Sequence, residues 1–189
     1  MATIEIIGKK IIEHSEHFLN LYEIKANAEW RSLIDHSKGK DLSDELVKEM
    51  ERCGWQKGWP YCMSMCEAMW RYTYETLGAP ESLRKEIFTK LTPSSMQTYN
   101  NFKSKITKTP VPGAIFLMQH GKTSNGHAGI VCGVKNGIIA TIEGNTSARG
   151  ATSVEADRNG DCIVKKTRSL NFTVSSGLYL KGFINPIAW

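Results

Sequence analysis

The sequence predicts an α+β fold, in which helices from the first half of the chain pack on an antiparallel β-sheet from the second half. Apolar residues recur at helical spacing up to about residue 91, and after Gly113 they follow the patterns of short strands. Helices that precede strands, without alternating with them, are typical of α+β proteins. The length of 189 residues fits a single domain.

The first part of the chain is expected to be helical. We predict four helices, over residues 11–34, 43–52, about 62–77 and about 80–91. Ser43 is the expected N-cap of the second helix, and Gly54 follows its end. The third helix is expected to stop at Gly78, and the fourth to begin at Pro80, because proline suits a first helical turn.

The second part of the chain is expected to form the sheet. Residues 92–113 are polar and contain three prolines, so we interpret them as a linker within the domain. Five strand-like segments follow, with the sequences AIFLM, HAGIVCGV, IIATIE, DCIVKKTR and LYLKGFI. We therefore expect one domain over residues 1–189, with a helical part of about 1–91 and a sheet part of about 114–189.

Composition and charge exclude several classes of protein. Hydrophobic residues make up 41% of the chain, and no apolar run approaches the roughly 20 residues that span a bilayer. The N-terminal segment is too charged for a secretory signal, so we expect synthesis in the cytoplasm without a signal peptide. The net charge of +5 favours anionic partners, but the basic residues form no stripe with interleaved aromatics, which disfavours nucleic-acid binding.

The five cysteines indicate neither a disulfide framework nor a zinc site. Their number is odd, and the chain shows no secretory signal. The nearest pair, Cys62 and Cys66, has three intervening residues, whereas zinc sites usually contain a closer pair. We expect no metal and no cofactor, because a thiol and an imidazole supply both a nucleophile and a base.

Cys62 is the candidate nucleophile. It follows Pro60 and Tyr61 at the start of a predicted helix. A helix N-terminus favours the thiolate over the thiol, whose ordinary pKa is about 8.5. The unpaired N–H groups of the first turn can also hold the oxyanion that forms when a carbonyl is attacked. Cys66 lies one turn deeper and is expected to be buried, and the other three cysteines are interpreted as structural.

His127 is the candidate base. It opens the strand HAGIVCGV, and a rigid element of this kind holds the geometry that a base needs. His14, His17 and His36 lie among charged residues of the helical part and are expected to face solvent. His120 precedes a glycine in an expected loop.

The register of the hairpin over residues 127–145 decides which side chains lie beside His127. A three-residue loop with Gly137 in the left-handed conformation pairs Val134 with Ile138. Only this register makes one face of the hairpin wholly apolar and leaves His127, Glu143 and Asn145 together on the other. Either polar partner can then accept the second ring N–H of the histidine, so the catalytic interpretation depends on this register.

Several segments of the sequence resemble those of a known family. The sequence GWQKGWPYCMSMCEAMW resembles the nucleophile segment of CHAP domains, the cysteine- and histidine-dependent amidohydrolases/peptidases common in phage endolysins. Family members usually have tryptophan at the position of Tyr61. VPGAIFLM resembles the family's Pro-Gly-Asp strand, with Ala114 in place of the acidic residue. Three more segments resemble the histidine strand, the Glu-Gly-Asn segment and the last strand, namely NGHAGIV, TIEGNTS and LYLKGFINP.

The resemblance covers roughly residues 25–187 and implies a papain-like fold. It implies attack on an amide in the peptide part of bacterial peptidoglycan. We also expect a monomer that acts in the cell wall or periplasm after release or delivery. The implied roles are nucleophile, base, orienting group and supporting group, for Cys62, His127, Glu143 and Asn145 respectively. Papain-like proteases place an oxyanion-hole glutamine near the offset of Gln56, and Tyr61 beside the nucleophile is a second candidate for oxyanion or substrate contact.

Alternatives stay open at this point. The cleaved bond can be that of an N-acetylmuramoyl-L-alanine amidase or of a peptidoglycan endopeptidase, since both need the same residues. The enzyme can serve phage lysis, belong to a virion or be a toxin delivered against rivals. A different thiol hydrolase or acyltransferase on the same scaffold and a catalytically silent wall-binding module are the competing functions.

Overall fold

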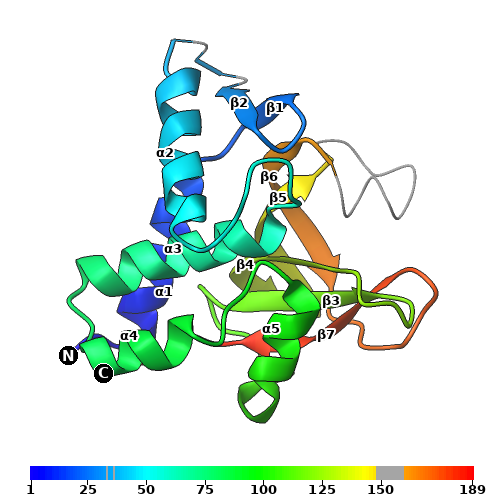
Figure 1. Cartoon of the computed structure of the whole chain (residues 1–189). Helices are drawn as coiled ribbons and strands as arrows, with labels where there is room; N and C mark the ends of the chain where they lie inside the picture. Colours follow the sequence, from blue (N-terminus) through cyan, green and yellow to red (C-terminus); the bar gives the residue numbers. More distant parts are fainter. Residues whose placement is uncertain (33, 36, 148–159) are drawn as a thin grey trace.

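The computed structural model describes residues 1–32, 34–35, 37–147 and 160–189. In this part of the chain five α-helices and a 3₁₀ turn combine with seven strands, which confirms the α+β class (Figure 1). The helices are α1 (Ile4–His17), α2 (Gly39–Glu51), α3 (Cys62–Thr76), α4 (Glu81–Phe88) and α5 (Ser95–Asn101), and η1 covers Lys103–Lys105. The strands are β1 (Leu21–Lys25), β2 (Glu29–Ser32), β3 (Ile115–His120), β4 (Gly126–Lys135), β5 (Ile138–Thr146), β6 (Cys162–Ser169) and β7 (Leu178–Ile184).

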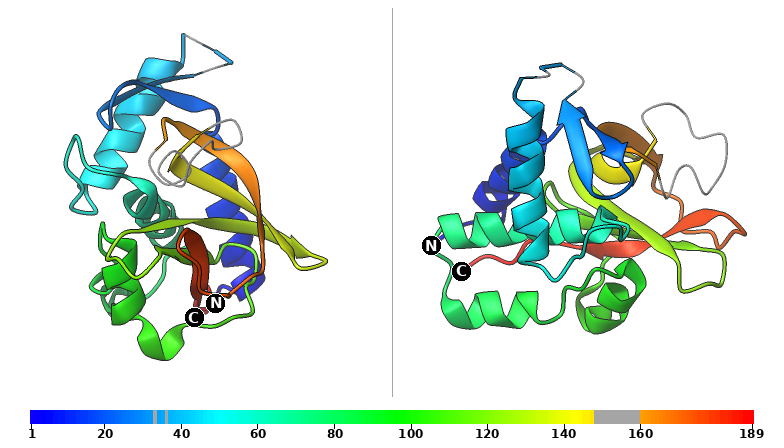
Figure 2. Two further views of the ribbon diagram at one scale, coloured as in Figure 1. Left: turned by 90° about the vertical axis from the view of Figure 1, so that its right-hand side faces the viewer. Right: turned by 45° about the horizontal axis from the view of Figure 1, so that its top comes forward.

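The seven strands form one antiparallel sheet in the order β2-β1-β6-β5-β4-β3-β7. Helices α1, α2 and α3 lie together beside this sheet, α4 packs against α3, and α5 packs against β3 and β4 (Figures 1 and 2). None of the helices in the described residues is long and apolar enough to cross a membrane.

Both faces of the central sheet are buried. Ala128, Ile130 and Ile142 belong to the large core that the helices cover, where Trp70 of α3 is also fully buried. Phe116 and Val131 belong to a second, smaller apolar cluster, against which Leu170 and Phe172 of the segment after β6 are packed. The strands at the centre of the sheet therefore carry buried apolar residues on both faces.

The expected helix over residues 11–34 is wrong beyond residue 17, because residues 21–32 form the hairpin β1–β2. The helix stops near Phe18, and Asn20 then takes the left-handed conformation with φ of 65°. A second left-handed asparagine, Asn27 with φ of 47°, lies in the hairpin turn. Asparagine tolerates this conformation better than other non-glycine residues. The expected helical part of residues 1–91 thus contributes two strands to the sheet.

Two further expectations for the helices need correction. Helix α2 begins at Gly39, four residues before Ser43, and the buried Ser43 hydroxyl accepts the backbone N–H of Trp30 at 3.0 Å instead of capping the helix. The expected linker of residues 92–113 contains α5, whose N-cap is Ser94. By contrast, Gly54 and Gly78 follow α2 and α3 with positive φ angles, as expected.

The predicted register of the β4–β5 hairpin is wrong at the turn. Lys135, not Val134, is paired with Ile138, and Val134 and Ile138 are 43% and 48% exposed. A β-bulge between Val131 and Gly133 adds one residue to β4, so Ile130 is paired with Ile142, as in the predicted register. The prediction assumed a single buried face, whereas apolar residues are buried on both faces here. The bulge restores the expected register at the end of the hairpin that carries His127.

Candidate active site

Cys62 is the first residue of α3 and follows the turn-rich segment of residues 54–61. The N-cap residue Tyr61 makes no side-chain capping hydrogen bond, so its side chain leaves the first-turn N–H groups open. Only 6% of Cys62 is exposed. A thiol in this position experiences the positive end of the helix while it is largely shielded from water.

His127 connects the thiol to a carboxylate. Its Nε2 lies 2.9 Å from Oε2 of Glu143, and both side chains are fully buried. Because Nε2 is taken by the carboxylate, Nδ1 is the ring nitrogen left for Cys62, whose thiol interacts with the imidazole. Nδ1 makes no hydrogen bond within the described part of the chain. The N–H groups of Ala128 and Met63 also interact with the sulfur. The order of groups is therefore thiol, imidazole, carboxylate.

The pKa shifts at these three groups favour a thiolate–imidazolium pair. Burial raises the pKa of Cys62, but the interactions of its sulfur with His127 and with the N–H groups of Ala128 and Met63 outweigh burial and hold the pKa below the ordinary value. Burial lowers the pKa of His127, but Cys62 and Glu143 together raise it to about 9. Glu143 has a pKa well below its usual range, because Arg168 and His127 outweigh its desolvation. At pH values between the lowered pKa of Cys62 and the raised pKa of His127, the site carries a thiolate and an imidazolium in the absence of substrate.

Two side chains besides His127 donate hydrogen bonds to Glu143. Arg168 donates from Nε to Oε1 at 2.9 Å and from a terminal guanidinium nitrogen to Oε2 at 2.6 Å. The Thr141 hydroxyl donates to Oε1 at 2.6 Å. Each carboxylate oxygen therefore accepts two hydrogen bonds, which fills the capacity of an ionised carboxylate.

A family comparison agrees with this geometry. The model of the CHAP domain matches residues 53–145, a segment that contains Cys62, His127, Glu143 and Asn145. The chain carries a CHAP domain. A CHAP domain implies a cysteine- and histidine-dependent amidohydrolase or peptidase, with peptidoglycan as its substrate. Searches among curated proteins and among solved structures returned no significant match.

The remaining predicted site residues of the CHAP domain lie in different environments. Asn145 is fully buried at the end of β5, with φ of 58°, and its carbonyl accepts the N–H of Gly160 at 3.0 Å. Gln56 has an exposed side chain in the turn before Cys62, so its access to an oxyanion stays a prediction.

Tyr61 does not fit the expected contact with substrate, because it is fully buried. Its hydroxyl donates to the carbonyl of Cys162 at 3.4 Å and accepts the indole N–H of Trp30 at 3.2 Å. Its ring packs against Gly144, where an added Cβ would lie 2.8 Å from a ring carbon. Tyr61 therefore supports the site by fixing the start of α3 against β5 and β6.

The other cysteines and histidines that the structure describes do not belong to the series of Cys62, His127 and Glu143. Cys66 is fully buried, and burial raises the pKa of its thiol well above the ordinary value. His14 was expected to face solvent but is 7% exposed, with Nε2 2.9 Å from a carboxylate oxygen of Glu49. His36 lies outside the described residues. The described residues contain no group of histidine, cysteine and acidic side chains that could hold a metal ion.

Sequence reasoning missed Arg168 and Thr141. Thr141 lies two residues before Glu143 on the same strand face, which was a usable signal once β5 was assigned. Arg168 lies beyond the matched segment, on β6, where it is paired with Ile139. Finding it requires the β5–β6 register. The sequence suggested a hairpin turn at Asn159-Gly160 but did not fix this register, and residue 159 lies outside the described residues.

Proposed function

We propose that the protein is a peptidoglycan hydrolase, either an N-acetylmuramoyl-L-alanine amidase or an endopeptidase of the peptide part. The observation that carries the proposal is the buried series of Cys62, His127 and Glu143 at a helix N-terminus, within a segment that matches the CHAP domain. Peptidoglycan is a polymer with amide bonds and free carboxylates, and a net charge of +5 suits such an anionic substrate. We place its action in the cell wall or periplasm, during phage lysis, during virion entry or after delivery by a competitor.

The proposed reaction starts with Cys62 as thiolate and His127 as imidazolium. The sulfur attacks the amide carbon, and the carbonyl electrons move to the oxygen, which the first-turn N–H groups of α3 stabilise together with Gln56. The imidazolium then gives its Nδ1 proton to the departing amine as the C–N bond breaks. Neutral His127 next takes a proton from water, which attacks the thioester and releases the carboxylic acid and the thiolate. Glu143 keeps the other ring proton at Nε2 throughout.

The test is hydrolysis of purified sacculi, followed by turbidity and by mass spectrometry of the released fragments. We expect Cys62→Ala to remove activity by a factor of about 10³ or more, because the nucleophile is lost. Cys66→Ala is the matched control on the same helix, and we expect it to retain most of the activity.

The fragments then identify the bond. A free N-terminal alanine indicates the amidase reaction, and other new N-termini indicate an endopeptidase. Sacculi that stay intact with the wild-type protein would contradict the proposal, as would an active Cys62→Ala variant beside an inactive Cys66→Ala variant.

A further inference from the structure

A polar groove lies beside the proposed catalytic histidine. It has a volume of about 430 Å³, and side chains of α5, of the turn between β3 and β4, and of β7 line it. The lining groups that matter here are Gln97 and Tyr99 of α5, Gln119 at the end of β3, Ser124 of the turn and Lys181 of β7. We call this hollow the α5 groove.

The α5 groove begins one residue from His127. Gln119 in its wall is the antiparallel partner of Gly126, the residue that precedes His127. Met96, in the opposite wall, also lies against Gly126, where an added Cβ would be 3.2 Å from its sulfur and 2.6 Å from the Ser95 hydroxyl. The groove is therefore adjacent to the end of β4 that carries His127, the residue that protonates the departing amine in the proposed reaction.

Lys181 is a cation held in the α5 groove without an acidic partner. Its ammonium group lies 5.0 Å from the ring centre of Tyr99 and 5.7 Å from that of Tyr179. The Tyr179 hydroxyl donates to the side-chain oxygen of Gln119 at 2.8 Å, which fixes the second ring. The residues that line the groove include no aspartate or glutamate, and Lys181 has no ion pair in the described part of the chain.

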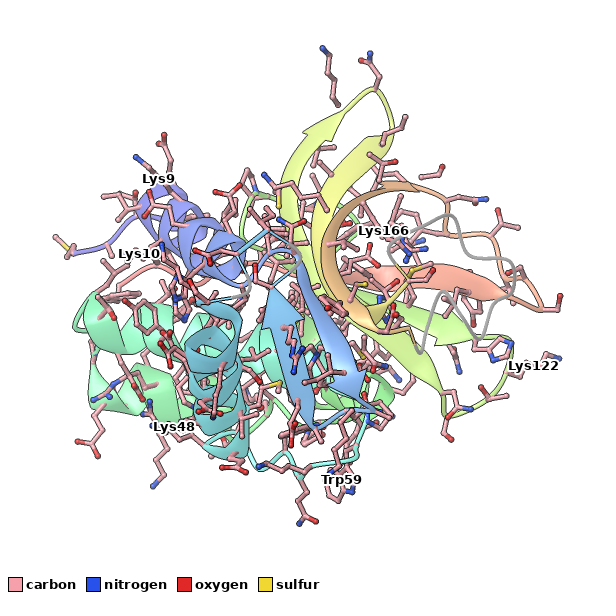
Figure 3. The ribbon with its side chains drawn as sticks, turned by 90° about the horizontal axis from the view of Figure 1, so that it is seen from above. Lys9, Lys10, Lys48, Trp59, Lys122 and Lys166 are labelled. Atoms are coloured by element: carbon pink, nitrogen blue, oxygen red, sulfur yellow. The ribbon has the colours of Figure 1, made fainter. Side chains whose placement is uncertain are left out.

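This arrangement suits an anion better than a cation or a neutral chain. Two aromatic rings place the ammonium group by cation–π attraction, so little side-chain freedom remains to be lost when a ligand arrives. The amide and hydroxyl groups nearby can donate hydrogen bonds to a carboxylate. The exposed lysines that Figure 3 labels are spread over the molecule, with Lys9 on α1, Lys48 on α2 and Lys122 in the β3–β4 turn.

We propose that the α5 groove is a subsite for the amine-side part of the substrate, and that Lys181 binds a free carboxylate of that part. The proposal rests on the proposed function and adds a substrate requirement to it. In a stem peptide of the type L-Ala–γ-D-Glu–L-Lys–D-Ala, two carboxylates qualify: the α-carboxylate of D-glutamate and the terminal one of D-alanine.

The test measures binding without hydrolysis, in the inactive Cys62→Ala protein. The probes are the synthetic tetrapeptide, the same peptide with the D-glutamate carboxylate amidated, and the same peptide with the C-terminus amidated. NMR titration gives the dissociation constant for each. We expect one of the two amidations to weaken binding by about five- to tenfold, the scale of a hydrogen-bonded charge pair, and thereby to identify the carboxylate.

Lys181 is then replaced. Lys181→Met in the Cys62→Ala background is expected to remove the preference for the free carboxylate, and Lys181→Arg to keep most of it. Lys135→Met, which removes the same charge at the exposed tip of the β4–β5 hairpin, is expected to keep the preference in full.

Equal binding of the acid and both amides, or an unchanged preference in Lys181→Met, overturns the subsite. Carboxylate-dependent binding by a protein that leaves sacculi intact overturns the proposed function instead and keeps the subsite.

Discussion

At the scale of single residues, the chemistry of the site depends on a buried carboxylate that stays ionised. Burying an unpaired carboxylate costs several kcal/mol, and in practice the group takes up a proton instead. Glu143 is fully buried, yet its pKa lies well below the usual range, because the guanidinium of Arg168 and the ring of His127 both donate to it. An ionised Glu143 can only accept hydrogen bonds, so it keeps the Nε2 proton on His127 and leaves Nδ1 for the thiol.

Replacement of Arg168 by glutamine is expected to move the acidic limit of thiol reactivity to higher pH. Glu143 has a lowered pKa in the folded protein, and loss of Arg168 raises that pKa towards neutrality. A protonated Glu143 no longer stabilises the imidazolium, so the pKa of Cys62 rises as well. We expect the rising limb of the Cys62 alkylation rate with iodoacetamide to shift upward by roughly one pH unit, the scale of one hydrogen bond to a charged group.

Two variants separate this positioning role from a general loss of structure. Arg168→Lys keeps the charge without the bidentate fork, so part of the shift is expected to be restored. Arg52→Gln removes an arginine of the exposed pair with Glu75, and its alkylation profile is expected to match the wild type. An Arg168→Gln protein with an unshifted profile would show that Arg168 does not act through Glu143.

At the scale of elements, the β4–β5 hairpin brings His127 and Glu143 together. Asn136 and Gly137 have φ angles of 51° and 73°, the two positive values that a two-residue turn of type I′ requires. This turn alone would shift the whole hairpin by one residue relative to the register that the site needs. The bulge at Cys132 cancels the shift before the strand reaches Ile130.

Close packing beside the hairpin predicts that Gly129→Ala impairs the site. An added Cβ would lie 2.5 Å from a ring carbon of Phe116, 2.8 Å from the carbonyl oxygen of Ile142 and 2.9 Å from Cγ of Glu143. We expect a stability loss of roughly 1–3 kcal/mol by urea denaturation, together with slower Cys62 alkylation at neutral pH as Glu143 is displaced. Gly133→Ala is the control on the same strand, because nothing lies within 4 Å of its added Cβ. Equal stability and equal Cys62 alkylation rates in the two variants would show that close packing at Gly129 does not position Glu143.

Elements with strong local signals could be predicted from the sequence. The helix that begins at Cys62 ends before a left-handed glycine, and the five strands after Gly113 are bounded by clear breaks in pattern. The β1–β2 hairpin was missed because Trp30 and its neighbours fit helical spacing as well as they fit a short strand, and tertiary pairing with β6 decides between them. Helix α5 was missed because its seven residues are mostly polar.

For the site, the sequence signals suffice to select Cys62 and His127 as the candidate nucleophile and base, because Cys62 begins α3 and His127 is the second residue of β4. The partners of Glu143 could not be predicted in the same way, since Arg168 is placed by the pairing of β6 with β5. The bulge had one local sign, Gly133 inside a strand, which the register argument did not use.

At the scale of the whole molecule, the first and last segments of the chain are joined far from the thiol. Ala2 and Trp189 exchange two backbone hydrogen bonds, at 2.9 and 3.4 Å. The Tyr74 hydroxyl accepts the N–H of Ile187 at 2.7 Å and donates to its carbonyl at 3.1 Å, and the Trp189 ring lies 5.2 Å from the Tyr74 ring. Tyr74 is twelve residues from Cys62 on α3, about 18 Å along the helix axis.

Removal of residues 186–189 is therefore expected to lower stability without changing the chemistry of the site. The truncation leaves the buried Tyr74 hydroxyl without its partners and removes the Trp189 ring, so we expect a loss of roughly 2–4 kcal/mol in urea denaturation. Tyr74→Phe removes only the hydroxyl and is expected to cost about 1–2 kcal/mol. Under conditions in which each protein is fully folded, the Cys62 alkylation rate and its pH profile should equal those of the wild type. A truncated protein that is folded but alkylated tenfold more slowly would show instead that packing at the far end of α3 sets the position of the thiol.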